Sequence, residues 1–335
     1  MSHSALPLLS RRSLVAGAAL AALPLGRCLA KAVPGLEILG APTGATITLV
    51  RALASGALSS AAPEATFRLW RDTDDLRAAV VSGRTKLFST PTHVPANLAN
   101  RGMPLKLLCL LGMGHLTVVA EDERIKSFAD LAGQPVLGFF RNDMPDLVFR
   151  ACAKMEGLDP DKDLKLSYVQ TGMEAAQMLA AGRATAAILS EPPATAAIMM
   201  AAQQGRTLHR AISLQQVWTK HGAKNGATTG IPMVGVAMHA SLLDDSPELI
   251  DALRKSLPQA KDWVLANRSE AAALAEAKMQ MRPMIFEKAL EHFNMSIVPA
   301  EAARTELTRF YRAILDLAPD ALAGKLPGDD FYLAP

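Results

Sequence analysis

The chain has 335 residues, of which half are hydrophobic and 5% are aromatic, and its formal net charge is +3. This length accommodates two lobes of ordinary domain size, and the composition excludes a disordered chain. The positive charge does not indicate nucleic-acid binding. Residues 1–32 carry four basic residues and no acid, so without them the formal charge falls from +3 to −1.

The N-terminal residues have the pattern of an export signal. Arg11 and Arg12 precede an uncharged run over residues 13–26, and small residues follow around Ala30 and Ala32. The apolar run is too short to span a bilayer, which takes about 20 residues. We therefore predict a twin-arginine signal peptide over residues 1–32 and a periplasmic location. An ordinary signal with two adjacent arginines is the alternative.

Sequence patterns typical of strands and of helices alternate from residue 36 to residue 121. Strands are expected at 36–41, 66–70, 85–90, 105–112 and 115–121, and helices at 44–56, 72–83 and 95–102. The alternation restarts with a short helix and a strand over 127–140. Helices at 144–158, 172–184 and 192–205 and strands at 164–170, 185–191 and 231–240 follow. From Ser246 the chain is expected to be helical. This order predicts an α/β fold with mostly parallel sheets flanked by helices and a helical C-terminal region.

Two cysteines follow the signal region, Cys109 in a strand-like run and Cys152 in a helix-like run. We expect both to be buried free thiols, and a disulfide between them in an oxidising compartment is the alternative.

Four expected strand-to-helix junctions share a proline, and three of them carry Ser or Thr: residues 40–45, 89–94, 141–146 and 190–195. The first N–H groups of a helix lack partners within the helix and can bind the oxygens of a ligand. Ordinary helix capping explains the same residue types, so this alternative stays open. His115 and Thr117 precede an expected passage between lobes. The predicted ligand-binding residues are Pro42, Thr43, Gly44, Ser89, Thr90, Pro91, His115, Thr117, Asn142, Asp143, Met144 and Glu191.

The export signal, "LGAPTGA", "RATAAILSEPPATAA" and the ending "KLPGDDFYLAP" together resemble the periplasmic solute-binding proteins of ABC transporters, of the nitrate, taurine and sulfonate type. The resemblance implies the type II periplasmic-binding fold, with a second lobe inserted into the first. We expect lobe 1 over residues 35–119 and 236–335 and lobe 2 over 120–235. Apolar crossings are expected near 118–121 and 235–238.

The implied function is capture of a small organic solute between the lobes and delivery to a membrane permease and its ATPase. We expect a monomer that needs no cofactor or metal, binds no nucleic acid and has no catalytic residues. The solute is expected to be neutral or amine-bearing, because Arg141 is the only cation of the four junctions, whereas Asp143, Asp146 and Glu191 are acidic.

An enzyme and a sensor subunit are the two alternatives to a transport protein. No nucleophile elbow, phosphate-binding loop or zinc signature occurs, and the histidines lack the spacing of metal ligands. An enzyme resembling thiamine-pyrimidine synthase shares the fold, but that family has a Cys-rich motif that this sequence lacks. A sensor subunit that docks on a receptor is not separated from a transport protein by the sequence.

Overall fold

The computed structural model describes residues 32–223 and 230–334. The predicted signal peptide over residues 1–32 lies almost entirely outside these ranges. Within them, no helix combines the length and the apolar character that crossing a membrane requires.

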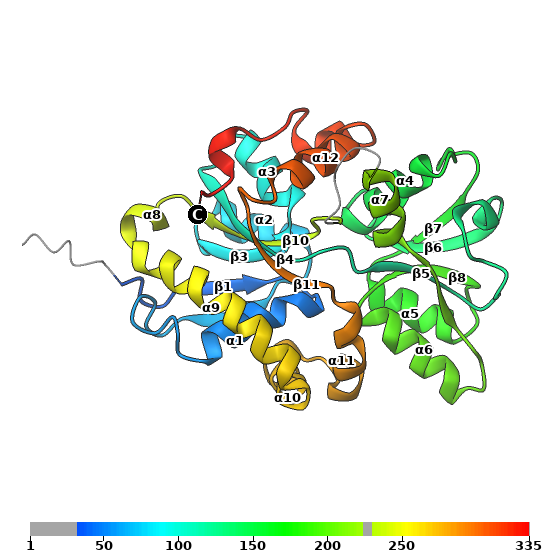
Figure 1. Cartoon of the computed structure of the whole chain (residues 1–335), viewed down its shortest axis with the longest axis horizontal. Coiled ribbons are helices and arrows are strands. Elements are labelled where there is room, and N and C mark those ends of the chain that lie inside the picture. Colours follow the sequence, from blue (N-terminus) through cyan, green and yellow to red (C-terminus); the bar gives the residue numbers. More distant parts are fainter. Residues whose placement is uncertain (1–31, 224–229, 335) are drawn as a thin grey trace, which may run out of the picture.

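The strands form two sheets that lie side by side in Figure 1. The order of the first sheet is β11 (Met295–Pro299), β4 (Leu105–Gly112), β10 (Val234–His239), β3 (Leu87–Pro91), β1 (Glu37–Gly40) and β2 (Thr66–Leu69). The order of the second is β7 (Lys165–Val169), β6 (Pro135–Phe139), β8 (Ala186–Ser190), β5 (Leu116–Ala120) and β9 (His209–Ser213). We call the first sheet with its helices lobe 1, and the second sheet with its helices lobe 2.

Most strands of each sheet run in one direction, as the sequence predicted. In lobe 1, β1 pairs in parallel with β2 and β3, and β4 shares their direction because both β3 and β4 pair antiparallel with β10. In lobe 2, β6 pairs in parallel with β7 and β8, and β5 alone runs against its neighbours. The carboxyl ends of the parallel strands are the sites where ligands bind in such sheets.

Helices cover both sheets. Lobe 1 contains η1 (Gly44–Thr46), α1 (Ile47–Ala54), α2 (Thr73–Val81), α3 (His93–Asn100), α8 (Leu242–Asp245), α9 (Pro247–Ala266), α10 (Arg268–Met279), α11 (Pro283–Ala289), η3 (Leu290–His292), α12 (Arg304–Leu315), η4 (Pro319–Leu322) and η5 (Asp329–Phe331). Lobe 2 contains η2 (Phe128–Leu131), α4 (Met144–Met155), α5 (Gly172–Ala180), α6 (Pro193–Gln203) and α7 (Leu214–Ala223). Two helices of lobe 1 also reach lobe 2: α11 packs on α6, and α12 packs on α4 (Figure 1).

Apolar strands and one face of each helix form the core. Ile38 and Leu39 of β1 and Val118 of β5 are completely buried, because both faces of each sheet are covered by helices. Cys109 and Cys152 are buried free thiols, as predicted. Burial raises the pKa of Cys109 to about 12, so its thiol stays protonated.

Two features of the fold differ from the sequence-based expectation. The expected crossing at 118–121 falls inside β5, which pairs along its whole length with β8 and β9 of lobe 2. The chain therefore leaves lobe 1 earlier, between β4 and β5. The expected return at 235–238 likewise falls inside β10, which already pairs with β3 and β4.

Two strands were also missed. β9 was not expected at all, and β11 interrupts the C-terminal region that was expected to be helical. Both are edge strands of five residues in which few residues are fully buried, so neither has a strong apolar pattern.

Candidate functional site

The four predicted junctions all follow a strand and open a helix. The first two connect β1 to η1 and β3 to α3 in lobe 1, and the other two connect β6 to α4 and β8 to α6 in lobe 2. The second and third junctions meet: His93 Nε2 of α3 lies 3.1 Å from Asp143 Oδ1 at the start of α4. The carboxyl ends of the parallel strands of the two lobes therefore face each other.

In lobe 1, the junction side chains differ in what they bind. Ser89 Oγ accepts a hydrogen bond from Ala41 N at 2.9 Å and lies 3.1 Å from Thr46 Oγ1, so it ties the first two junctions together within the lobe. The hydroxyl oxygens of Thr43 and Thr90 are buried and have no hydrogen-bond partner among the described residues. Buried polar groups are normally satisfied, so water is the natural partner of these hydroxyls, and neither threonine lines the two cavities described below.

The remaining predicted residues of these junctions are held by packing. Gly44 lies against the ring of Phe293, where an added Cβ would come within 2.2 Å of a ring carbon. Pro91 ends β3 and is half-buried. Gly44 thus lets the Phe293 ring approach the backbone more closely than a residue with a Cβ atom would allow.

In lobe 2, the third junction is built around carboxylates. Asp143 caps α4 and accepts a hydrogen bond from Met144 N at 2.7 Å. Asp146 accepts hydrogen bonds from Asn142 N at 2.8 Å and from Tyr168 Oη at 2.7 Å. Asn142 has a positive φ of 61°, a conformation that Asn tolerates better than most residues. Its side chain is exposed, whereas Met144 is buried.

Between the lobes lies a cavity of about 400 Å³, which we call the cleft cavity. From lobe 1 it is lined by Pro42, Arg71, Gln280, Met281, Arg282, Ile285 and Phe286, and from lobe 2 by Phe139, Phe140, Thr171, Gly172, Met173, Gln177, Ser190, Pro192, Pro193, Ala196 and Met200. Its described lining contains two arginines and no carboxylate. Arg71 pairs with Asp72 at 2.7 Å, whereas the side chain of Arg282 makes no hydrogen bond or ion pair with the described residues.

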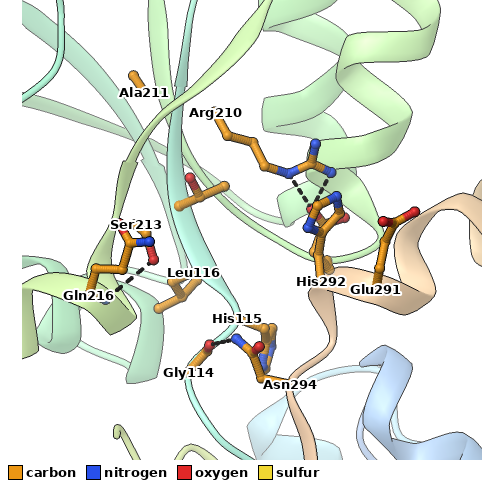
Figure 2. A pocket seen from close by; sticks show the side chains of 12 residues that line it. Gly114, His115, Leu116, Arg210, Ala211, Ser213, Gln216, Glu291, His292 and Asn294 are labelled. Carbon is orange, nitrogen blue, oxygen red and sulfur yellow. Dashed lines mark hydrogen bonds and ion pairs between the residues drawn. The ribbon is translucent and has the colours of Figure 1, made fainter. Parts of the chain in front are cut away.

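A second cavity of about 330 Å³ lies where the chain first passes between the lobes, and we call it the hinge cavity. Figure 2 shows it with Gly114, His115 and Leu116 of the passage on one wall. Arg210 and Ser213 come from lobe 2, and His292 and Asn294 come from lobe 1. Asn294 Nδ2 donates to the Gly114 carbonyl oxygen at 2.5 Å, which connects lobe 1 to the passage.

The hinge cavity brings three predicted residues together: His115, Thr117 and Glu191. Thr117 Oγ1 is already used, since it donates to the Ile212 carbonyl oxygen at 2.9 Å. Burial lowers the pKa of His115 to about 4, because the charged imidazolium loses its water, although a hydrogen bond with the Met113 backbone opposes the shift. His115 is therefore neutral at neutral pH.

Both carboxylate oxygens of Glu191 accept hydrogen bonds from other residues of lobe 2. One carboxylate oxygen accepts from Arg210 Nε at 2.9 Å and Nη2 at 2.5 Å, and the other accepts from Thr195 Oγ1 at 2.7 Å and Thr195 N at 3.1 Å. The carboxylate therefore caps α6 and is neutralised by Arg210. This pairing removes Glu191 from the grounds for expecting a neutral or amine-bearing solute, since its charge is already matched by Arg210.

Sequence reasoning missed the cations of the site. Arg210 lies on the edge strand β9, 19 residues after its partner, and Arg282 opens α11, about 90 residues after the fourth junction. No spacing pattern connects these residues, because the fold alone brings them together. Across residues 32–223 and 230–334, no group of three or more His, Cys, Asp or Glu side chains is placed to hold a metal ion.

The sequence profile of the NMT1-like family matches residues 73–278, so the chain belongs to the NMT1-like family. Several solved structures share its fold. An ABC transporter protein from Parabacteroides distasonis has a TM-score of 0.72 at 19% identity, with 90% of this chain and 99% of that chain covered.

Two further structures carry ligand names. The periplasmic aliphatic sulphonate binding protein SsuA from Escherichia coli has a TM-score of 0.66 at 18% identity, covering 89% of this chain and 99% of that one. The periplasmic nitrate-binding protein NrtA from Synechocystis has a TM-score of 0.65 at 15% identity, covering 87% and 84%. No curated protein sequence matches the chain significantly. The fold resemblance stated from the sequence is thereby confirmed.

Proposed function

We propose that the chain is an exported solute-binding protein that captures a small organic solute between its two lobes and delivers it to the permease of an ABC transporter. The observation that carries this proposal is the cleft cavity, which is lined from both lobes and has the volume of a small-molecule site. A solute that contacts both walls is bound more tightly when the lobes are together, so binding favours closure. The named structural neighbours, which bind a sulphonate and nitrate, support this function.

The lining of the cleft cavity supports a particular kind of solute. Phe139, Phe140 and Phe286 provide apolar surface, and Arg71 and Arg282 provide positive charge. Such a site suits a solute with a small apolar body and one anionic or hydrogen-bond-accepting head group. We propose that the protein binds this solute without changing it chemically, and that it works in the periplasm as a monomer.

A panel of small solutes tests the proposal by thermal shift, followed by calorimetry on each hit. A bound solute stabilises the folded protein by RT ln(1 + [L]/Kd), and this stabilisation raises the melting temperature. We expect hits among monoanionic organic molecules, and none among cationic amines of the same size. Stabilisation by cationic amines alone contradicts the proposed charge of the head group, but not capture between lobes.

Two matched substitutions then locate the site. Met200→Trp narrows the cleft cavity from α6, and Ala211→Trp narrows the hinge cavity from β9. We expect the first to weaken binding of the hit by roughly tenfold or more, the cost of a steric conflict, and the second to change it by less than about twofold. The reverse order assigns the solute to the hinge cavity instead.

A further inference from the structure

One ion pair connects a helix of lobe 1 to a helix of lobe 2. His93 is the first residue of α3 in lobe 1, and Asp143 is the capping residue of α4 in lobe 2. His93 Nε2 and Asp143 Oδ1 are 3.1 Å apart, and the His93 side chain is 2% exposed. Among the ion pairs of the described residues, this one alone joins the two lobes.

Neither partner needs the other for its local structure. Asp143 can cap α4 through its hydrogen bond with Met144 N alone. The other ring nitrogen of His93, Nδ1, is buried and has no hydrogen-bond partner in the described ranges, so the polar contact of the ring there is the one with Asp143 of lobe 2. The energy of this contact is therefore available only while the lobes are together.

We propose that His93 and Asp143 form a proton-dependent latch, which holds the two lobes together without solute when His93 is charged and releases them as the pH rises. This inference does not depend on which solute the protein carries. It predicts that the solute-free protein is mostly closed near pH 5 and more open near pH 8. Solute capture then shifts an equilibrium that the latch already sets.

The charge of Asp143 stays fixed over this range. Burial raises the pKa of its carboxyl group, but the hydrogen bond and charge of His93, the Met144 N–H group and the charge of Arg77 lower it more, and the resulting pKa is about 2. The carboxylate is thus ionised between pH 5 and 8, where histidine side chains change charge. Loss of the imidazole proton removes the attraction between two opposite charges and leaves only a hydrogen bond from the neutral ring to the carboxylate.

Two charged or titratable groups of neighbouring elements are placed beside the pair. Arg77 of α2 acts electrostatically on Asp143, and Tyr311 of α12 bonds the residue before His93. Tyr311 donates to the carbonyl oxygen of Thr92, next to His93, and burial raises its pKa far above the ordinary value. His93 is the imidazole among these groups, and imidazoles are the side-chain type that changes charge between pH 5 and 8.

Distances between spin labels on the two lobes test the latch in the solute-free protein. Val81→Cys on α2 and Lys165→Cys on β7 place labels at exposed positions, and the native Cys109 and Cys152 are buried. We expect the ratio of the closed population, with the short label distance, to the open population, with the long distance, to fall by roughly tenfold from pH 5 to pH 8. His93→Gln and Asp143→Asn are both expected to abolish this change, and Asn retains an oxygen that can cap α4.

A matched control uses a histidine–carboxylate pair within lobe 2. His221 Nε2 lies 2.7 Å from Glu156 Oε1, so His221→Gln removes an equivalent pair that does not join the lobes. This variant is expected to keep the full pH response. A wild-type distance distribution that does not change between pH 5 and 8 overturns the proposal. So does a response that persists in both His93→Gln and Asp143→Asn.

Discussion

The cleft cavity and the hinge cavity lie between the same two lobes but use their charged groups differently. In the hinge cavity, Arg210 is bound to Glu191 and Thr195, so its charge is already used by the protein. In the cleft cavity, Arg282 is exposed and has no hydrogen-bond or ion-pair partner among the described residues, and three phenylalanines line the same cavity. Polar groups that satisfy one another stabilise the fold, whereas an unpartnered cation beside apolar surface is available to a ligand. From this difference we propose that the hinge cavity is structural and that the cleft cavity binds the solute.

The largest expected effect follows from breaking the Arg210–Glu191 pair. Arg210→Met leaves the carboxylate of Glu191, which is 2% exposed, without its cation. We expect the free energy of unfolding to fall by about 3 kcal/mol, because an uncompensated buried charge is costly. Urea unfolding measures this loss, and the double variant Glu191→Gln with Arg210→Met should recover part of it. A single variant as stable as wild type shows that the pair is not structural.

The next largest expected effect is a loss of stability in acid, caused by His115 of the hinge cavity. His115 is neutral in the folded protein down to about pH 4, whereas an unfolded histidine takes up a proton below about 6.5. Because the unfolded state binds more protons between these values, the contribution of His115 to stability is lost as the pH falls from about 6.5 to about 4. We expect this loss to reach about 2 kcal/mol at pH 5 relative to pH 7. His115→Gln should unfold with a correspondingly weaker acid dependence, and an unchanged pH profile contradicts the burial argument.

Arg282→Met is the counterpart in the cleft cavity. Its removal breaks no hydrogen bond or ion pair within the described ranges, so we expect stability to change by less than about 0.5 kcal/mol. Binding of a monoanionic solute is expected to weaken by roughly tenfold, which corresponds to about 1.4 kcal/mol. Calorimetry and urea unfolding on the same sample separate the two effects. A loss of stability without a loss of affinity places Arg282 with the structural residues.

The sequence predicted the order of most elements and all four strand-to-helix junctions, because these depend on local signals. Apolar runs mark the buried strands, and Asp72 and Thr171 cap helices at the expected places. The passages between the lobes were placed a few residues late, inside apolar runs that prove to be the paired strands β5 and β10. Local composition cannot show to which sheet an apolar residue belongs.

The chemistry of the site was less predictable than its position. The sequence left open whether Glu191 faces a solute or pairs locally, and the structure shows local pairing, with a partner, Arg210, on an edge strand that has no apolar pattern. His93 and Asp143 are fifty positions apart, and only the packing of two lobes makes them neighbours. Long-range pairing depends on the tertiary fold, which a single sequence does not reveal through periodicity.

The central claim is that the solute is held in the cleft cavity by both lobes at once. A crystal structure of the protein with the strongest hit of the solute panel tests it most directly. We expect the solute between Phe139 of lobe 2 and Arg282 of lobe 1, with its anionic or accepting group toward the guanidinium and the hinge cavity free of it. A solute bound in the hinge cavity, or on the surface of a single lobe, contradicts the account.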